Sequence, residues 1–207
     1  MLPRLHIITD TTLQGRFSHF DLAKMAWKSG AVAVQYRNKS YDAAKDFGEL
    51  EAMAQLARDT GKVLIVNDDA QLAFQVGAQG VHLGKEDGDP EAARALLGPE
   101  AIIGATVHDF EELEAVRNAP IDYVGIGPVF GTTSKDTGLP KLGLDGLAAL
   151  CAASPFPVIA IGSIGVENMQ AVRKAGAYGA AVISAFCKAE NPEKAGLALL
   201  EALVAEG

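Results

Sequence analysis

Short apolar runs alternate with longer amphipathic stretches along the chain. The runs are rich in valine and isoleucine and stay apolar at successive positions, as expected for parallel strands buried on both faces. We expect strands at residues 5–10, 31–37, 63–68, 80–84, 101–107, 123–130, 157–163 and 179–184. Helical patterns follow them at residues 21–30, 41–61, 70–77, 90–98, 109–119, 144–154, 166–176 and 192–207. The pattern predicts eight strand–helix units.

One type of junction recurs along the chain. The segments SGAVAV (29–34), VGAQGV (76–81) and AGAYGA (175–180) each place a glycine between a helix end and a strand start. Glycine suits the left-handed residue that closes a helix, so the repetition indicates a repeated β/α unit. Eight units predict an α/β fold with a single (β/α)8 TIM barrel, comprising residues 1–207 as one domain. The competing open doubly wound sheet is disfavoured because the first turn, TDTTLQG, lacks GxGxxG.

Polar residues are concentrated at the predicted carboxyl ends of strands two to eight. In a barrel, those ends form the active site. The candidates are Gln35, Arg37, Lys39, Asn67, Asp68, Asp87, Thr106, His108, Gly162, Ser163, Ile183 and Ser184, together with the segment GPVFGTTSKDTG (127–138) after the sixth strand.

Three polar residues follow the second strand with a period of two. Gln35, Arg37 and Lys39 would therefore point to one side, toward the barrel mouth. Arginine can grip phosphate oxygens with two donors, and lysine acts as a point charge. The alternative is a solvated loop, but Gln35 lies inside an apolar run, which argues against it.

Two carboxylates, Asp68 and Asp87, follow neighbouring strands. Together with a substrate phosphate they suit Mg²⁺, so we expect a magnesium cofactor. Helix capping is the alternative role for each aspartate. Asp69 is better placed to cap the next helix, which would leave Asp68 free.

The loops after the last two strands contain small residues, in IGSIG (161–165) and VIS (182–184). Barrels often bind a phosphate there through backbone N–H groups. The sequence thus predicts two anion sites, with the segment 127–138 between them.

The composition narrows the classes of function. The net charge of −8 disfavours nucleic-acid binding. A phosphorylated small molecule, the partner that the two anion sites suggest, must therefore bind at a locally basic site. We expect no membrane span or secretory leader, and we expect Cys151 and Cys187 to be free thiols in a cytoplasmic protein. Whether identical subunits associate is left open. His6 and His82 fall within strands, where a position in the core or the barrel lumen is expected rather than a catalytic role.

An ordered set of motifs resembles a known family. VQYRNK, NDDAQLAFQVGAQGVHLGKED, DYVGIGPVFGTTSK, PVIAIGSIG and AVISA occur in that order. They resemble the thiamine-phosphate synthases over about residues 5–195. The resemblance implies that 4-amino-2-methyl-5-hydroxymethylpyrimidine pyrophosphate is joined to 4-methyl-5-(β-hydroxyethyl)thiazole phosphate, with Mg²⁺ required. The products would be thiamine phosphate and pyrophosphate.

The resemblance also implies a role for each site residue. It assigns the pyrimidine pyrophosphate to Gln35, Arg37, Lys39 and Asn67, Mg²⁺ to Asp68 and Asp87, pyrophosphate contacts to Thr106 and Lys135, and the thiazole phosphate to Thr132, Ser134, Gly162, Ile183 and Ser184. Pyrophosphate would leave first, giving a cation that the thiazole nitrogen captures. Arg37, Lys39 and Lys135 would be catalytic because they stabilise the leaving group.

The sequence departs from the family pattern without losing a charge from this site. Asn38, Thr106, Gly131 and Ser163 stand where the family commonly has Glu, Ser, Pro and Gly. A related thiazole tautomerase is one alternative, but such proteins tend to lack the charged set and use a histidine where Pro128 stands. A non-catalytic ligand-binding barrel is another, and it would be expected to have lost at least one charged residue.

Overall fold

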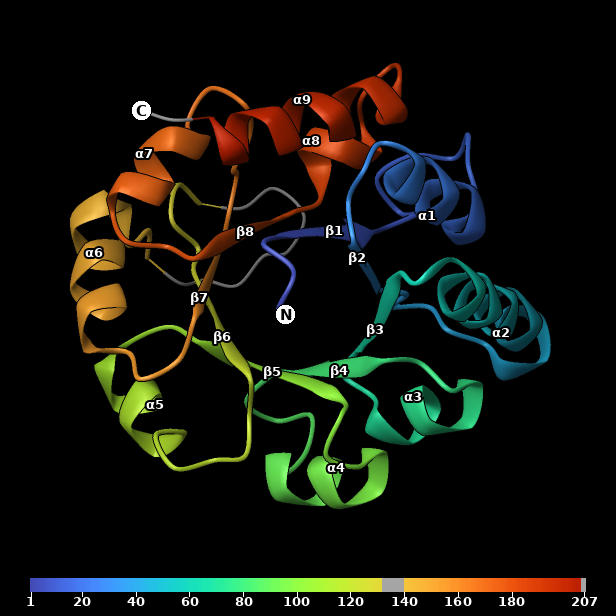
Figure 1. The fold of residues 1–207 in the computed structure, drawn as a ribbon, viewed down its shortest axis with the longest axis horizontal. Helices are drawn as coiled ribbons and strands as arrows, with labels where there is room; N and C mark the ends of the chain where they lie inside the picture. The colour runs from blue at the N-terminus through green and yellow to red at the C-terminus, as the bar shows by residue number, and fades with distance from the viewer. Residues whose placement is uncertain (132–139, 206–207) are drawn as a thin grey trace.

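Eight parallel strands form a closed barrel in the computed structural model, which describes residues 1–131 and 140–205 (Figure 1). The strands are β1 Leu5–Thr9, β2 Ala33–Tyr36, β3 Val63–Asn67, β4 Gly80–Leu83, β5 Ile102–Val107, β6 Tyr123–Ile126, β7 Val158–Ile161 and β8 Gly179–Val182. Each strand pairs with the next, and β8 pairs with β1. The predicted (β/α)8 fold is confirmed, and each of the eight strands falls within its predicted range.

Helices surround the barrel in Figure 1. They are α1 His19–Lys28, α2 Ala43–Thr60, α3 Ala70–Val76, α4 Pro90–Leu97, α5 Phe110–Ala115, α6 Gly143–Ala153, α7 Met169–Lys174, α8 Ser184–Cys187 and α9 Pro192–Val204. The short helix α8 was not predicted, because it continues the apolar run of β8 without a polar linker. Helix α5 ends four residues before its predicted end, where the chain forms a turn.

Polar side chains fix where most helices begin. At the start of α1, Ser18 and Asp21 form a capping box, in which each side chain bonds the other's backbone N–H. The Asp69 side chain accepts a hydrogen bond from the Leu72 N–H at 2.8 Å and so caps α3, as predicted. The neighbouring Asp68 is thereby left for the barrel mouth.

The core has two parts. The larger part lies between the strands and the helices and includes Leu22, Leu50 and Ile103, which are fully buried. The smaller part fills the barrel lumen with Ile8, Tyr123, Ile159 and Ala181. Because the lumen is packed, a ligand can enter the barrel only from its mouth.

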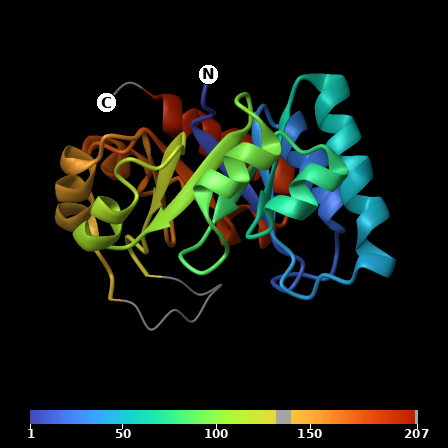
Figure 2. The same ribbon diagram turned by 90° about the horizontal axis from the view of Figure 1, so that it is seen from below.

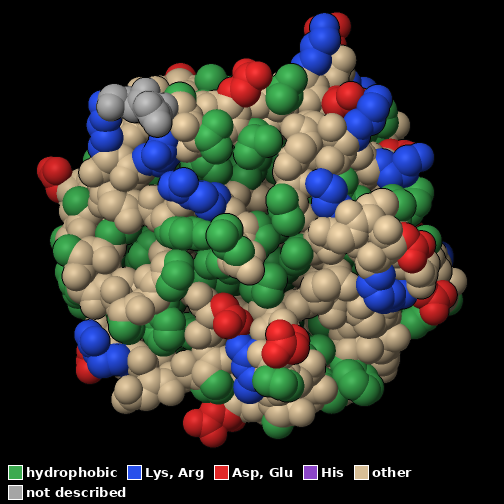
Figure 3. All heavy atoms as spheres, in the orientation of Figure 1, with side chains coloured by type: hydrophobic (Ala, Val, Ile, Leu, Met, Phe, Trp, Pro, Cys, Tyr) green, Lys and Arg blue, Asp and Glu red, His purple; other side chains and the backbone are tan. Residues whose placement is uncertain are grey.

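The two ends of the barrel differ. In Figure 2 the N-terminus lies on one side of the barrel, and the blue loops that follow β1 and β2 lie on the opposite side. In Figure 3 hydrophobic side chains gather near the middle of the face shown, with charged side chains around them. None of the helices in the described ranges is long and apolar enough to cross a membrane.

Candidate active site

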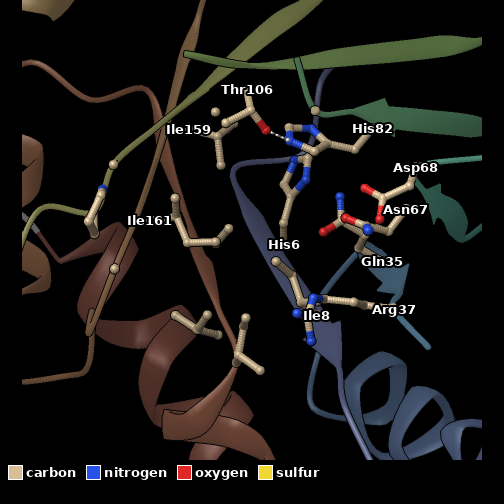
Figure 4. A pocket seen from close by; sticks show the side chains of 18 of the residues that line it. His6, Ile8, Gln35, Arg37, Asn67, Asp68, His82, Thr106, Ile159 and Ile161 are labelled. Carbon is tan, nitrogen blue, oxygen red and sulfur yellow. Dashed lines mark hydrogen bonds between the residues drawn. The ribbon is translucent and has the colours of Figure 1, made fainter. Parts of the chain in front are cut away.

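A cavity of about 380 Å³ opens at the carboxyl ends of the strands, and residues from all eight strands or their following loops line it (Figure 4). The predicted site residues that line this cavity are Gln35, Arg37, Lys39, Asn67, Asp68, Asp87, Thr106, His108, Gly162, Ser163, Ile183 and Ser184. The structure therefore brings together all the predicted residues that it describes. Thr132, Ser134 and Lys135 lie outside the described residues.

Arg37 is held by a carboxylate at the end of the neighbouring strand. Its guanidinium forms an ion pair with Asp10, whose side chain is almost completely buried. The Asp10 carboxylate also accepts a hydrogen bond from the Thr12 backbone N–H at 2.9 Å. Register explains the pairing, because Thr9 of β1 lies beside Tyr36 of β2 and the next residues of both strands are therefore adjacent. Asp10 does not line the cavity, but it holds a residue that does, and the sequence did not single it out.

Lys39 forms an ion pair with Asp68, and both side chains are partly exposed to the cavity. Asp68 has a φ of 71°, an unfavourable left-handed conformation for a residue other than glycine. The surrounding structure enforces it, since the Asp68 N–H donates to the His82 carbonyl at 2.8 Å. Strained backbone of this kind is concentrated at functional sites.

The two aspartates at the mouth influence each other. Burial alone would raise the pKa of Asp68, but hydrogen bonds with Lys39 and Asp87 hold it below its ordinary value. For Asp87, burial and then the neighbouring Asp68 carboxylate raise the pKa, although the Gly84 N–H donates to it at 3.0 Å. A cation between the two carboxylates would relieve this repulsion.

The pair of Asp68 and Asp87 fits Mg²⁺, which usually takes one or two carboxylates and completes its shell with water and phosphate oxygens. Within residues 1–131 and 140–205, no group of three or more His, Cys, Asp or Glu side chains is arranged to hold a metal. The two carboxylates therefore suit a cation whose remaining ligands come with the substrate.

His6 and His82 form the floor of the cavity (Figure 4). This agrees with the core or lumen positions expected for both histidines from the sequence. Burial lowers the pKa of both side chains to about 4, so both are neutral near pH 7. The His82 ring lies between the Tyr123 hydroxyl and the Thr106 hydroxyl, at 2.9 Å from each.

The opposite wall, from β6 to β8, is apolar or small. Ile159 and Ile161 face the charged residues across the cavity in Figure 4. Gly162 has a φ of 112°, and a Cβ atom there would lie only 2.7 Å from the Pro128 Cα. Glycine thus permits the close approach of the loops after β6 and β7. The next residue, Ser163, also has a positive φ, of 50°.

The fold and the cavity together define a (β/α)8-barrel enzyme with its site at the carboxyl ends of the strands. The chain belongs to the thiamine monophosphate synthase family, whose model matches residues 5–186. The resemblance inferred from the motifs is confirmed.

Curated relatives and solved structures agree with this assignment. A thiamine-phosphate synthase from Salinibacter ruber is 42% identical over 192 residues, covering 93% of this chain and 85% of the relative. One from Azorhizobium caulinodans is 40% identical over 191 residues, covering 92% and 90%. The structure of a thiamine phosphate pyrophosphorylase from Pyrococcus furiosus matches with a TM-score of 0.85 at 34% identity, covering 97% of this chain and 95% of that one. A 3-hexulose-6-phosphate synthase, at 20% identity and a TM-score of 0.70, shares the fold alone.

Proposed function

We propose that this protein is a thiamine-phosphate synthase. It joins 4-amino-2-methyl-5-hydroxymethylpyrimidine pyrophosphate to 4-methyl-5-(β-hydroxyethyl)thiazole phosphate and releases pyrophosphate. The observation that carries the proposal is the gathering of two cations and two carboxylates, Arg37, Lys39, Asp68 and Asp87, on one wall of one cavity. The names of the curated relatives support it.

The charged wall binds the pyrimidine pyrophosphate in this proposal. Arg37 and Lys39 each already contact one carboxylate. A guanidinium has five N–H donors and an ammonium has three, so both retain donors for phosphate oxygens. Gln35 and Asn67, which line the same wall, add neutral polar contacts.

Asp68 and Asp87 would hold Mg²⁺, which supplies positive charge to the leaving pyrophosphate when it is bound. The raised pKa of Asp87 reflects the repulsion between the two carboxylates after the effect of burial, and this repulsion favours a cation at that position. Mg²⁺ dependence is accordingly part of the proposal.

The opposite wall binds the thiazole phosphate. Ile159 and Ile161 offer apolar surface to the ring, and Gly162, Ile183 and Ser184 lie where barrels of this kind bind a phosphate. The contacts expected from Thr132, Ser134 and Lys135 fall outside the described residues and stay predictions.

The reaction proceeds by dissociation. The bond between the pyrimidinylmethyl carbon and the pyrophosphate oxygen breaks, and its electron pair leaves with pyrophosphate. The thiazole nitrogen then donates its lone pair to the resulting cation. Arg37 and Lys39 stabilise the charge on the leaving group, and the isoleucine wall excludes water that would compete for the cation.

The cytoplasm is the proposed place of action. Cys151 and Cys187 are both free thiols, and burial raises the pKa of each to about 11, so neither is reactive. Inert free thiols suit a reducing compartment.

The test supplies both substrates and Mg²⁺ to the purified protein. Pyrophosphate and thiamine phosphate should form in equal amounts, and omission of either substrate should abolish thiamine phosphate. Isomerisation of the thiazole without any thiamine phosphate would instead identify the tautomerase. Failure to turn over either compound would identify a binding barrel.

A further inference from the structure

A row of hydrogen bonds crosses three neighbouring strands beneath the cavity. The Tyr123 hydroxyl of β6 lies 2.9 Å from His82 Nδ1 of β4. His82 Nε2 lies 2.9 Å from the Thr106 hydroxyl of β5, as the dashed line in Figure 4 marks. The intervening residue Gly104 allows this, because a Cβ there would lie 2.5 Å from His82 Nδ1. In the sheet register Gly104 is the neighbour of both His82 and Tyr123.

The bond between Tyr123 and His82 has a defined direction. Within the described part of the chain, His82 is the hydrogen-bond partner of the Tyr123 hydroxyl, which is almost completely buried. If His82 donated to that oxygen, the phenol hydrogen would be buried without an acceptor, which is strongly unfavourable. The phenol therefore donates to His82 Nδ1.

The direction continues through the imidazole ring. Burial raises the pKa of Tyr123, so the phenol keeps its hydrogen. An imidazole nitrogen that accepts a hydrogen bond carries no hydrogen, so the His82 ring is neutral when the phenol donates to Nδ1. A neutral imidazole has a single N–H. Since Nδ1 accepts, Nε2 carries the hydrogen and donates it to the Thr106 oxygen.

We propose that Tyr123 and His82 are positioning residues that fix the Thr106 hydroxyl as a donor into the cavity. The Thr106 oxygen accepts from His82, so its own hydrogen turns toward the ligand. The group it meets must accept a hydrogen bond, which a pyrophosphate oxygen does. This inference deepens the proposed function and rests on it for the identity of the ligand.

The expected contribution is that of one hydrogen bond from a neutral donor, the Thr106 hydroxyl, to a charged acceptor. Such a bond contributes about 1.5–3 kcal/mol, so its loss should lower kcat/KM by roughly tenfold to a hundredfold. The donor is already oriented before the charge develops, which is the arrangement that favours stabilisation of a leaving group.

The first experiment reads the histidine tautomer directly and requires no turnover. Wild-type protein labelled with ¹⁵N in its four histidines would be measured by two-dimensional NMR that correlates ring nitrogens with ring hydrogens. The expected spectrum shows His82 with a protonated Nε2 and a bare Nδ1. The opposite tautomer in wild-type protein would overturn the proposal.

Variants separate the roles of the three residues. Thr106→Ser keeps the donor and should stay within about threefold of wild type, whereas Thr106→Val should lose the full contribution. Tyr123→Phe should give a mixture of His82 tautomers and an intermediate loss. Tyr178→Phe is the matched control, because its hydroxyl donates to the Leu2 carbonyl at 2.8 Å and Tyr178 does not line the cavity.

Binding of inorganic pyrophosphate with Mg²⁺, measured by calorimetry, distinguishes two kinds of failure. If Thr106→Val weakens pyrophosphate binding but no variant or wild type makes thiamine phosphate, the donor assignment stands and the proposed function fails. If Thr106→Val binds pyrophosphate as tightly as wild type and turns over normally, the assignment of Thr106 is wrong. If Tyr123→Phe leaves His82 wholly protonated on Nε2, the role of Tyr123 is wrong.

Discussion

The two walls of the cavity differ in the kinds of residue that line them. From β1 to β4 the wall consists of charged side chains that hold one another, as in the Arg37–Asp10 and Lys39–Asp68 ion pairs. From β6 to β8 it consists mostly of small and apolar residues, among them glycine, proline, isoleucine and serine. Under the proposed function, the first wall would bind a ligand through side-chain charge and the second through shape and main-chain groups. A substitution should therefore act by loss of charge on one wall and by displacement of backbone on the other.

Loss of a cation from the charged wall should have the largest effect. Lys39→Ala removes a positive charge from the proposed pyrophosphate site, and kcat/KM should fall about a hundredfold. The Lys39 side chain is 47% exposed, so the free energy of unfolding should change by less than about 1 kcal/mol. Steady-state kinetics and urea unfolding measure the two effects.

A matched control for Lys39 lies on the outer surface. Lys28 forms an ion pair with Glu193 at 3.0 Å and is 73% exposed, and it does not line the cavity. Lys28→Ala should leave both the kinetics and the stability unchanged. Equal kinetics for the Lys39 and Lys28 variants would show that the charge of Lys39 takes no part in catalysis.

Removal of the buried carboxylate should have a smaller effect on activity but a larger one on stability. Asp10→Asn leaves the Arg37 guanidinium without its anionic partner, and the side chain of Asp10 is only 1% exposed. The free energy of unfolding should fall by about 3 kcal/mol. We expect kcat/KM to fall about twentyfold, because Arg37 is no longer held toward the cavity. An unchanged free energy of unfolding in this variant would mean that the Arg37–Asp10 ion pair does not stabilise the fold.

Displacement of backbone on the opposite wall should act on one substrate only. Gly162→Ala introduces a Cβ that would lie 2.7 Å from the Val129 nitrogen, at a φ of 112°. The loops after β6 and β7 must separate, so KM for the thiazole phosphate should rise about tenfold. KM for the pyrimidine pyrophosphate should change little. A rise in both KM values would show that the two walls are not independent.

Restoration of glycine at the neighbouring position should have the smallest effect. Ser163→Gly relieves a φ of 50° but increases the freedom of the unfolded chain, and the two terms offset each other within about 1 kcal/mol. If the wall recognises phosphate through its backbone, KM for the thiazole phosphate should change less than about threefold. A tenfold rise would show that the Ser163 hydroxyl itself contacts the ligand.

The contrast between the walls also explains what the sequence could predict. Charged residues at the ends of apolar strands are conspicuous, so Arg37, Lys39 and Asp68 could be assigned to the barrel mouth from their positions. Asp10 also ends a strand, and the same rule applied to the first strand would have found it. Its partner could not be inferred, because that depends on the register between β1 and β2.

The apolar wall and the floor could not be found in this way. Ile159 and Ile161 look like any other strand residues, and only the tilt of the strands decides which alternate residues face the lumen. Tyr123 likewise reads as core, and its contact with His82 depends on a glycine on the strand between them. These features are properties of strand register, which local residue patterns do not contain.

Closure of the barrel joins the beginning of the chain to a late strand. The Ala180 N–H donates to the Arg4 carbonyl at 2.8 Å, and the Tyr178 hydroxyl donates to the Leu2 carbonyl. A ribosome must therefore synthesise the chain through β8 before β1 can gain its second neighbour. Until then the nascent chain exposes an open strand edge of the kind that pairs with other chains. The active site has walls from both the early and the late strands, so it is one of the last features that can form during translation.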